Sequence, residues 1–207
     1  MYSTLIIARM KPGAERDVAR VFAAFDDTDM PHRMGTRRRE LFVLQDLYFH
    51  LQDFTTDDGG QRIDEVRLDP RFTAISEDLK PYITPYDPAT WRTPADAMGR
   101  SFYRGPVRPA TDAHSGVTVH RMPDGARDEV ARACGTADST GDARSCRREL
   151  FQFHELCVEV EEYDSPAAEA RYASRTGTSL SPLTTPYVAD RPIRESRAHR
   201  FYRWAAA

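Results

Sequence analysis

A histidine and an arginine lie close together in a short stretch of this chain, where both could act on a bound ligand. Residues 36–44 and 47–54 read as two strands joined by a two-residue turn, which places Arg39 diagonally across from His50, about 7 Å away between backbones. An imidazole with an ordinary pKa near 6.5 can accept and return a proton close to neutral pH. A guanidinium can stabilise a carbonyl or enolate oxygen. The pair therefore predicts proton transfer on a bound ligand.

The two faces of this predicted hairpin differ in character. One face is apolar through its middle and is expected to lie under helices; it carries Arg38, Glu40, Phe42, Leu44, Leu47, Phe49, Leu51 and Asp53. The other face mixes hydrogen-bonding with apolar groups and is expected to line a cavity; it carries Arg37, Arg39, Leu41, Val43, Tyr48, His50 and Gln52. On this interpretation Tyr48, Gln52 and Arg37 are candidate substrate-binding residues. A three-residue loop would instead shift the register by one residue.

The candidate residues also have purely structural interpretations. His50 could be a hydrogen-bonded core residue, and Tyr48 could be no more than cavity wall. Arg39 could form an ion pair with Asp26 or Glu40 that serves only the fold.

The chain repeats itself, which determines its predicted organisation. The pentapeptide at residues 38–42 recurs at 147–151, and three shorter matches follow in the same order. These shorter matches pair residues 9–10 with 121–122, 84–86 with 185–187, and 102–104 with 201–203. We therefore expect two domains, residues 1–108 and 109–207, joined near residues 106–115, which are rich in Pro, Ala, Asp and Gly.

Each repeat is predicted to be an α+β unit of the ferredoxin-like type, with the order β-α-β-β-α-β. In the first repeat the strands are expected at residues 4–10, 36–44, 47–54 and 97–105, and the helices at 14–25 and 61–68, with more helix possible up to residue 79. The uncovered sheet face of such a unit needs a partner. We expect the two units to face each other as an intramolecular dimeric α+β barrel, in a monomeric pseudo-dimer. The alternative is a homodimer in which each unit finds its partner in a second chain.

Composition excludes several classes of protein. The chain has 207 residues with 29 Lys and Arg beside 32 Asp and Glu, and its net charge of −3 gives no positive field to attract nucleic acid. The three cysteines match no zinc or redox spacing, so we expect reduced intracellular thiols and no metal site. The apolar run at residues 5–8 is far shorter than the roughly 18 residues of a membrane span, and no basic region precedes it. We expect a cytoplasmic, soluble protein.

Several short motifs of the first repeat together resemble the tetracenomycin-type polyketide cyclase family. The segments that carry the resemblance are residues 25–31, 35–39, 41–42, 46–51, 69–70, 84–86 and 102–103. The likeness extends over nearly all of residues 1–105. The second repeat resembles the family only in its strands, and residues 135–139 read as unrelated to the loop at 26–31.

The resemblance implies a ferredoxin-like fold, a dimeric barrel, and ring closure of an aromatic polyketide intermediate without metal or cofactor. It also implies that Asp26, Arg39 and His50 act in catalysis, with Asp27 beside them as a binding residue. Phe25 stands where some members place a histidine, which argues against a two-histidine mechanism. An aldol condensation needs an enolate, a carbonyl held nearby and loss of water, and positioning the two groups can supply about 7 kcal/mol or more. The implied partners are the small-molecule polyketide and components of the polyketide synthase.

The second repeat keeps the strands but changes the candidate residues. Cys157 stands where the first repeat has Tyr48, and Glu159 stands where it has His50, while Arg148 is kept as a candidate binding residue. A second active site would use Glu159, Glu161 and Arg148, with His154 in the adjoining turn. Two other functions stay open for the whole chain, a cofactor-free monooxygenase that oxidises aromatic polyketides to quinones and a non-catalytic polyketide-binding protein.

Overall fold

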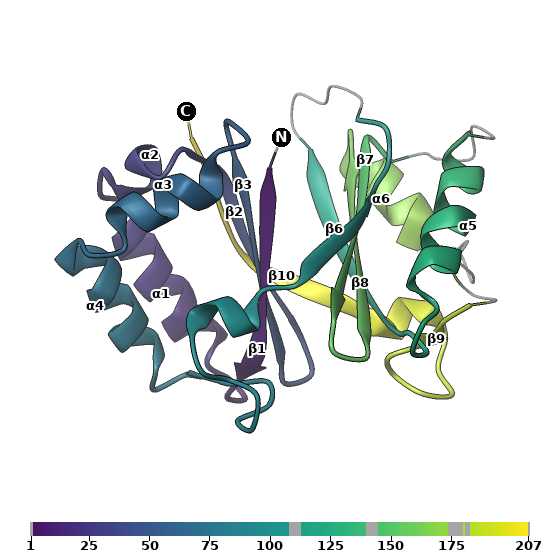
Figure 1. Ribbon diagram of the computed structural model, residues 1–207, viewed down its shortest axis with the longest axis horizontal. Coiled ribbons are helices and arrows are strands. Elements are labelled where there is room, and N and C mark those ends of the chain that lie inside the picture. Colours follow the sequence, from purple (N-terminus) through teal and green to yellow (C-terminus); the bar gives the residue numbers. More distant parts are fainter. Residues whose placement is uncertain (1, 108–112, 140–144, 174–179, 181–182, 207) are drawn as a thin grey trace. The chain divides into compact units, whose positions relative to one another are not determined.

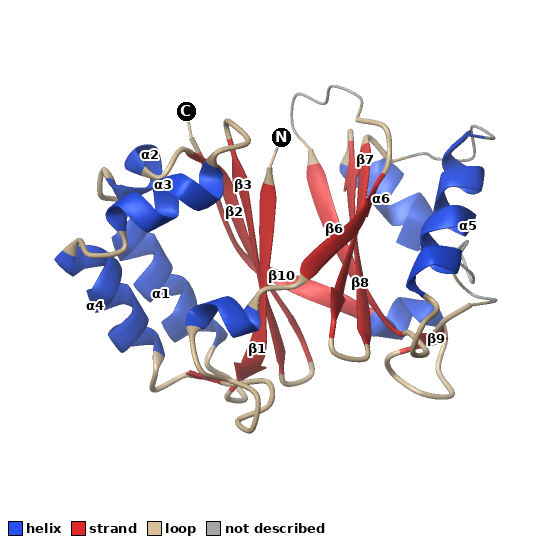
Figure 2. Ribbon diagram, in the orientation of Figure 1, coloured by secondary structure: helices blue, strands red, loops and turns tan. Residues whose placement is uncertain are grey.

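The computed structural model describes residues 2–107, 113–139, 145–173, 180 and 183–206 (Figure 1). They form two compact units, one made of Met1–Met98 with His199–Ala207 and the other of Gly99–Ala198. Each unit is a sheet with helices on one face, as the colouring by secondary structure shows (Figure 2).

The first unit has an antiparallel sheet in the order β4-β1-β3-β2-β10. Its strands are β1 (Ser3–Met10), β2 (Thr36–Leu44), β3 (Leu47–Phe54), β4 (Ile83–Thr84) and the part of β10 (Arg197–Ala205) that begins at His199. Its helices are α1 (Glu15–Asp26), α2 (Met30–Arg33), α3 (Gly59–Val66) and α4 (Pro70–Leu79), followed by the 3-10 turn η1 (Pro94–Ala97). The strands at 36–44 and 47–54 have the predicted bounds, because alternating apolar residues fix their extent.

The second unit repeats this plan. Its strands are β5 (Arg100–Arg104), β6 (His114–Arg121), β7 (Arg147–Phe153), β8 (Leu156–Tyr163) and β9 (Thr185–Pro186). They pair in the order β9-β6-β8-β7-β5, and the first two residues of β10 also pair with β6. Its helices are α5 (Arg127–Ser139) and α6 (Pro166–Ala173), with the 3-10 turn η2 (Ile193–Ser196). The two tandem α+β units of ferredoxin-like order are therefore confirmed.

The last strand of each repeat belongs to the compact unit of the other repeat. β5, from the first repeat, pairs with β7, and β10, from the second repeat, pairs with β2. The compact units thus differ from the sequence repeats 1–108 and 109–207, whose junction falls partly on residues 108–112, outside the described residues. The expected barrel arrangement of the two units stays a prediction.

The hairpin register is the predicted one, but the assignment of its faces is wrong. Leu41 opposes His50 and Val43 opposes Tyr48, as a two-residue turn requires. Leu41 and Tyr48 pack in one cluster with Val18 and Phe22 of α1, so the face expected to be open lies under the helices. Polarity misleads here because every residue of β3 is buried and the polar groups on its helix-covered face bind one another.

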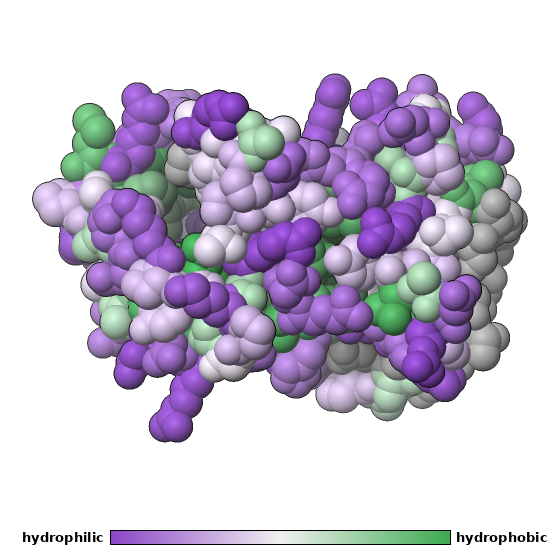
Figure 3. Space-filling model, turned by 90° about the horizontal axis from the view of Figure 1, so that it is seen from below, coloured by the Kyte–Doolittle hydropathy of each residue, from purple (hydrophilic) through white to green (hydrophobic). Residues whose placement is uncertain are grey.

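Charged and polar side chains dominate the face of the molecule shown in Figure 3. Among the described residues, no helix has the length and apolar composition needed to cross a membrane.

Candidate active site

Arg39 is the centre of a buried polar cluster in the first unit. Its side chain is 3% exposed; its Nε lies 3.0 Å from Oδ1 of Asp26, and its Nη1 lies 3.1 Å from Nε2 of His50. The rings of Phe22 and Phe25, both on α1, lie 5.0 and 5.3 Å from the guanidinium carbon. The structure thus brings together the three residues expected to act, across α1, β2 and β3.

His50 is held in its neutral form. Burial, and secondly the charge of Arg39, lower the pKa of His50 well below its usual value, so the expectation of an ordinary pKa near 6.5 is wrong. An arginine can only donate, so Nε2 of His50 accepts the hydrogen bond from Arg39 and the ring proton resides on Nδ1. The His50 ring also packs against Phe22 in a T-shaped contact, with 5.0 Å between centroids.

Asp26 ends α1, where the helix dipole disfavours a negative charge. Burial raises the pKa of Asp26, while Arg39 and the hydroxyl of Tyr202 oppose that rise. The Tyr202 hydroxyl donates to Oδ2 of Asp26 at 2.9 Å. A carboxylate with a raised pKa, held between two donors, can accept a proton from carbon more readily than an exposed aspartate can.

Apart from Nε of Arg39, which forms the ion pair with Asp26, two buried donors of this cluster have no hydrogen-bond partner among the described residues. They are the hydroxyl of Tyr48, a residue only 2% exposed, and Nη2 of Arg39. Burial raises the pKa of Tyr48, and Arg39 is near enough for its charge to oppose that rise, so Tyr48 keeps its proton. Leaving a buried donor unpaired costs about 1–3 kcal/mol, so two such donors near enough to interact electrostatically point to an oxygen that binds there.

Apolar side chains surround the cluster. Buried members come from α1 and the sheet, and a partly exposed margin adjoins them. This margin consists of Val43, Ile75, Leu79, Tyr82, Ile83, Trp91, Phe201 and Tyr202. Three of these eight residues, Tyr82, Trp91 and Tyr202, have aromatic rings with a polar group. Such rings suit contact with a flat, partly polar ligand.

The remaining predicted binding residues of the first repeat do not join the cluster. Asp27 is exposed at the end of α1. Gln52 opposes Arg39 in the hairpin, but its amide donates to the Thr36 hydroxyl at 2.7 Å. A register shift between Thr36 and Arg38 interrupts the alternation at Arg37, whose guanidinium lies 3.7 Å from Asp53 on the opposite face.

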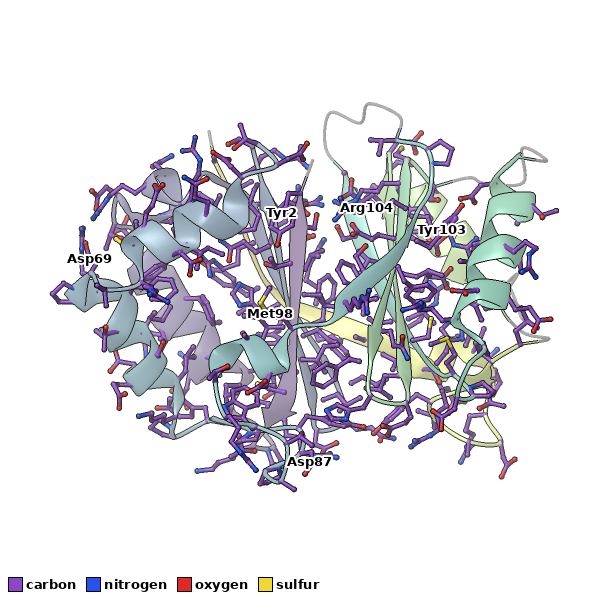
Figure 4. The ribbon with its side chains drawn as sticks, viewed as in Figure 1. Tyr2, Asp69, Asp87, Met98, Tyr103 and Arg104 are labelled. Atoms are coloured by element: carbon purple, nitrogen blue, oxygen red, sulfur yellow. The ribbon has the colours of Figure 1, made fainter. Side chains whose placement is uncertain are left out.

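The second unit holds a related cluster around Arg148. Nε of Arg148 donates to Glu159 at 2.7 Å, and its Nη1 lies 3.6 Å from Asp138. Tyr103 of β5 donates to Asp138 of α5, and Figure 4 shows Tyr103 on the side of β5 that faces α5. The interpretation of residues 135–139 as unrelated to the loop at 26–31 missed Asp138. The offset that matches residues 9–10 with 121–122 also matches Asp26 with Asp138, and could have found it.

An imidazole is also present in this second cluster, but it comes from a different strand. Nε2 of His120, on β6, lies 3.3 Å from Glu159, and its Nδ1 lies 3.2 Å from the Thr184 hydroxyl. Burial opposes ionisation of Glu159, yet Arg148 and His120 bring its pKa down to about 2. The sequence-based set for a second site is therefore only half assembled. Glu161 accepts a hydrogen bond from Tyr163 at 2.7 Å, and His154 is exposed in the turn.

Among the described residues, no three His, Cys, Asp or Glu side chains gather closely enough to hold a metal ion.

In comparisons with known proteins, both repeats match the same family. The family model described as polyketide synthesis cyclase matches residues 2–105 and again residues 114–205. An uncharacterized protein of Streptomyces coelicolor is 48% identical over 111 residues, which cover 53% of this chain and 99% of that protein. Tetracenomycin F2 cyclase of Streptomyces glaucescens is 37% identical over 102 residues, covering 49% of this chain and 92% of the cyclase. A putative monooxygenase from Lactobacillus acidophilus shares the fold, with a TM-score of 0.57 at 8% identity, covering 99% of this chain and 97% of that one.

Proposed function

Since this chain belongs to the polyketide synthesis cyclase family, we propose that its first unit closes a ring of an aromatic polyketide intermediate in antibiotic biosynthesis. The reaction is an intramolecular aldol condensation followed by loss of water, and it uses no metal or cofactor. The supporting observation is that buried Arg39 contacts both the Asp26 carboxylate and the neutral His50 imidazole. Nη2 of Arg39 and the Tyr48 hydroxyl also have no hydrogen-bond partner among the described residues.

The substrate class follows from the surroundings of the cluster. A partly cyclised polyketide is a flat aromatic system that carries ketone and phenol oxygens on an otherwise apolar frame. The apolar side chains under α1 would bind the frame, and the partly exposed rings of Tyr82, Trp91 and Tyr202 would stack on the part already aromatic. Binding in one folded conformation supplies much of the rate enhancement, because the reacting carbons are then held together.

Arg39 and Tyr48 stabilise the charge that develops on oxygen. Nη2 of Arg39 and the Tyr48 hydroxyl donate to the carbonyl oxygen that becomes an enolate, replacing the partner each lacks among the described residues. Each well-placed donor of this kind contributes about 10²–10³ in rate. His50 accepts from Nη1 of Arg39 and so fixes the orientation of the guanidinium.

Asp26 transfers the proton. Its carboxylate removes a proton from the carbon between two carbonyl groups, and the C–H electrons move to the enolate oxygen. The enolate carbon then attacks the second carbonyl, a carbon–carbon bond forms, and the new alkoxide takes the proton back from Asp26. Loss of water from this alcohol gives the aromatic ring. The raised pKa of Asp26 suits both the removal and the return of the proton.

The mass of the product tests this proposal. Purified protein would be incubated with the polyketone mixture released by a minimal aromatic polyketide synthase, with dissolved oxygen recorded at the same time. Ring closure with dehydration predicts a product lighter by one water for each ring, no oxygen uptake, and the same rate after dialysis against EDTA. A product heavier by oxygen, formed with oxygen uptake, would identify a monooxygenase instead. Tight binding of the mixture without turnover would identify a binding protein.

A further inference from the structure

Tyr202 reaches the candidate site of the first unit from the second repeat. It lies on β10, opposite Leu41 of β2 and therefore on the helix-covered face that carries Arg39 and His50. Its hydroxyl donates to Asp26, and its ring centroid lies 6.4 Å from that of Phe22. The other polar members of the cluster, Asp26, Arg39, His50 and Tyr48, belong to the first repeat, so the site is complete only when β10 is in place.

The position of Tyr202 differs from that of a side chain that serves only the core. Its hydroxyl contacts a buried carboxylate, while its ring is partly exposed in the margin of Tyr82, Trp91 and Phe201. The ring can therefore touch a ligand while the hydroxyl holds Asp26. A phenol whose own pKa is raised by burial stays protonated and remains a donor throughout the working pH range.

The other unit provides an internal comparison. Tyr103 of β5 opposes Leu150 of β7 and donates to Asp138, as Tyr202 opposes Leu41 and donates to Asp26. The arginine of that unit, however, is engaged by two carboxylates, Glu159 and Asp138, whereas Nη2 of Arg39 has no partner among the described residues. Among the residues that the structure describes, the tyrosine–aspartate pair thus adjoins an available donor in the first unit and not in the second.

We propose that Tyr202 is a positioning residue for the ring closure, which the second repeat contributes to the site of the first unit. Its hydroxyl fixes Asp26 with Oδ1 beside Arg39, so that the carboxylate meets the carbon that loses its proton. This inference rests on the proposed function. It also gives the second repeat a part in the reaction that needs no active site of its own.

The test compares Tyr202→Phe with Tyr103→Phe in the full chain. Each change removes one hydroxyl from an equivalent tyrosine, so any effect on the strand itself should be shared. With the polyketone mixture as substrate, Tyr202→Phe is expected to lower kcat about tenfold, the effect of losing one hydrogen bond to a charged group, with KM little changed. Tyr103→Phe is expected to keep the wild-type kcat. Equal kcat in the two variants and the wild type would overturn the proposal.

A second readout separates this inference from the proposed function. Because the Tyr202 hydroxyl lowers the pKa of Asp26, its removal should move the titration of the Asp26 carboxyl to higher pH, measured by carbon-13 NMR with assignment from Asp26→Asn. The acid limb of the pH–rate profile should move in the same direction. If the wild type closes no ring but this titration shifts, the proposed function fails and the hold of Tyr202 on Asp26 stands. An unshifted titration in Tyr202→Phe would refute the inference whatever the wild type does.

Discussion

Arg39 is a buried cation whose two contacts differ in charge, the carboxylate of Asp26 and the neutral ring of His50. The resemblance of short sequence motifs singled out all three residues, and the structure brings Asp26 and His50 each within ion-pairing or hydrogen-bonding distance of Arg39. The protonation state of His50 could not be predicted, because it depends on burial and on which nitrogen meets the guanidinium. Tyr202 was missed because it lies far along the chain, in a segment that reads as an ordinary strand.

Replacing Tyr48 with phenylalanine should separate stability from activity. The Tyr48 hydroxyl is buried without a hydrogen-bond partner among the described residues, so its removal should raise the free energy of unfolding by about 1 kcal/mol. The same change should lower the rate of ring closure about a hundredfold, since one oxyanion donor is lost. Urea unfolding and initial rates measure the two effects. A loss of stability together with full activity would mean that the hydroxyl serves the fold alone.

The burial of His50 predicts a pH dependence of stability. The folded state holds the imidazole neutral, while the unfolded chain takes up a proton near pH 6.5, so acid favours unfolding as the pH falls below about 6.5. His50 alone should lower the free energy of unfolding by up to about 1.4 kcal/mol for each pH unit that the pH falls in that range. Urea unfolding of the wild type and of His50→Gln from pH 7.5 to pH 5 should show a steeper fall in the wild type. Parallel curves would contradict a depressed pKa for His50.

At the scale of the elements, the sequence predicted the strands well but not what covers them or where the last strand pairs. Alternation in the hairpin identified which residues share a face, and it could not tell which face α1 covers, because both faces of β3 are buried. The sequence also did not show which strand the last strand of each repeat pairs with. Residues 102–104 and 201–203 have the same sequence, Phe-Tyr-Arg, so the strand of either repeat fits beside β2 or β7.

The docking of α3 on the sheet can be tested at two adjacent glycines. A Cβ on Gly59 would lie 2.4 Å from the ring of buried Phe54, whereas a Cβ on Gly60 would meet nothing closer than the Tyr2 hydroxyl at 3.6 Å. Gly59→Ala should therefore destabilise the fold by about 1–3 kcal/mol through overpacking. Gly60→Ala should be neutral or stabilise by up to about 1 kcal/mol, because alanine favours the helix. Similar melting temperatures for the two variants would show that α3 does not pack on Phe54 in this way.

At the scale of the whole molecule, one duplication has produced two units with the same fold and different polar clusters. The tyrosine, aspartate and arginine are kept in both. In the second unit a glutamate replaces the histidine on the equivalent strand, and His120 appears on β6. In the second unit Glu159 accepts a hydrogen bond from Nη2 of Arg148. The equivalent donor of the first unit, Nη2 of Arg39, has no partner among the described residues. Conservation of the strands therefore predicted the fold of the second unit, and it could not predict the loss of that available donor.

The strand exchange predicts the behaviour of an isolated first repeat. A chain of residues 1–107 keeps β5 but lacks β10, so β2 would be left as an unpaired edge. Two such chains can satisfy both edges by exchanging β5, and we expect a homodimer in light scattering coupled to size-exclusion chromatography. In that dimer the Tyr103 hydroxyl would donate to Asp26, as Tyr202 does in the full chain. Tyr103→Phe should therefore lower the activity of the dimer, although it should leave that of the full chain unchanged. A stable, folded monomer of residues 1–107 would contradict the need for the exchanged strand.

The most direct measurement compares the ring-closure rates of Arg39→Lys and Arg148→Lys on the same polyketone mixture. Lysine keeps the positive charge beside the carboxylate but lacks the planar fork that reaches two partners and an oxygen at once. A reactive centre at Arg39 predicts a loss of about a hundredfold or more in Arg39→Lys, within the range for removal of an oxyanion donor, and a rate near that of the wild type in Arg148→Lys. Full activity in Arg39→Lys, with the loss appearing in Arg148→Lys instead, would contradict it.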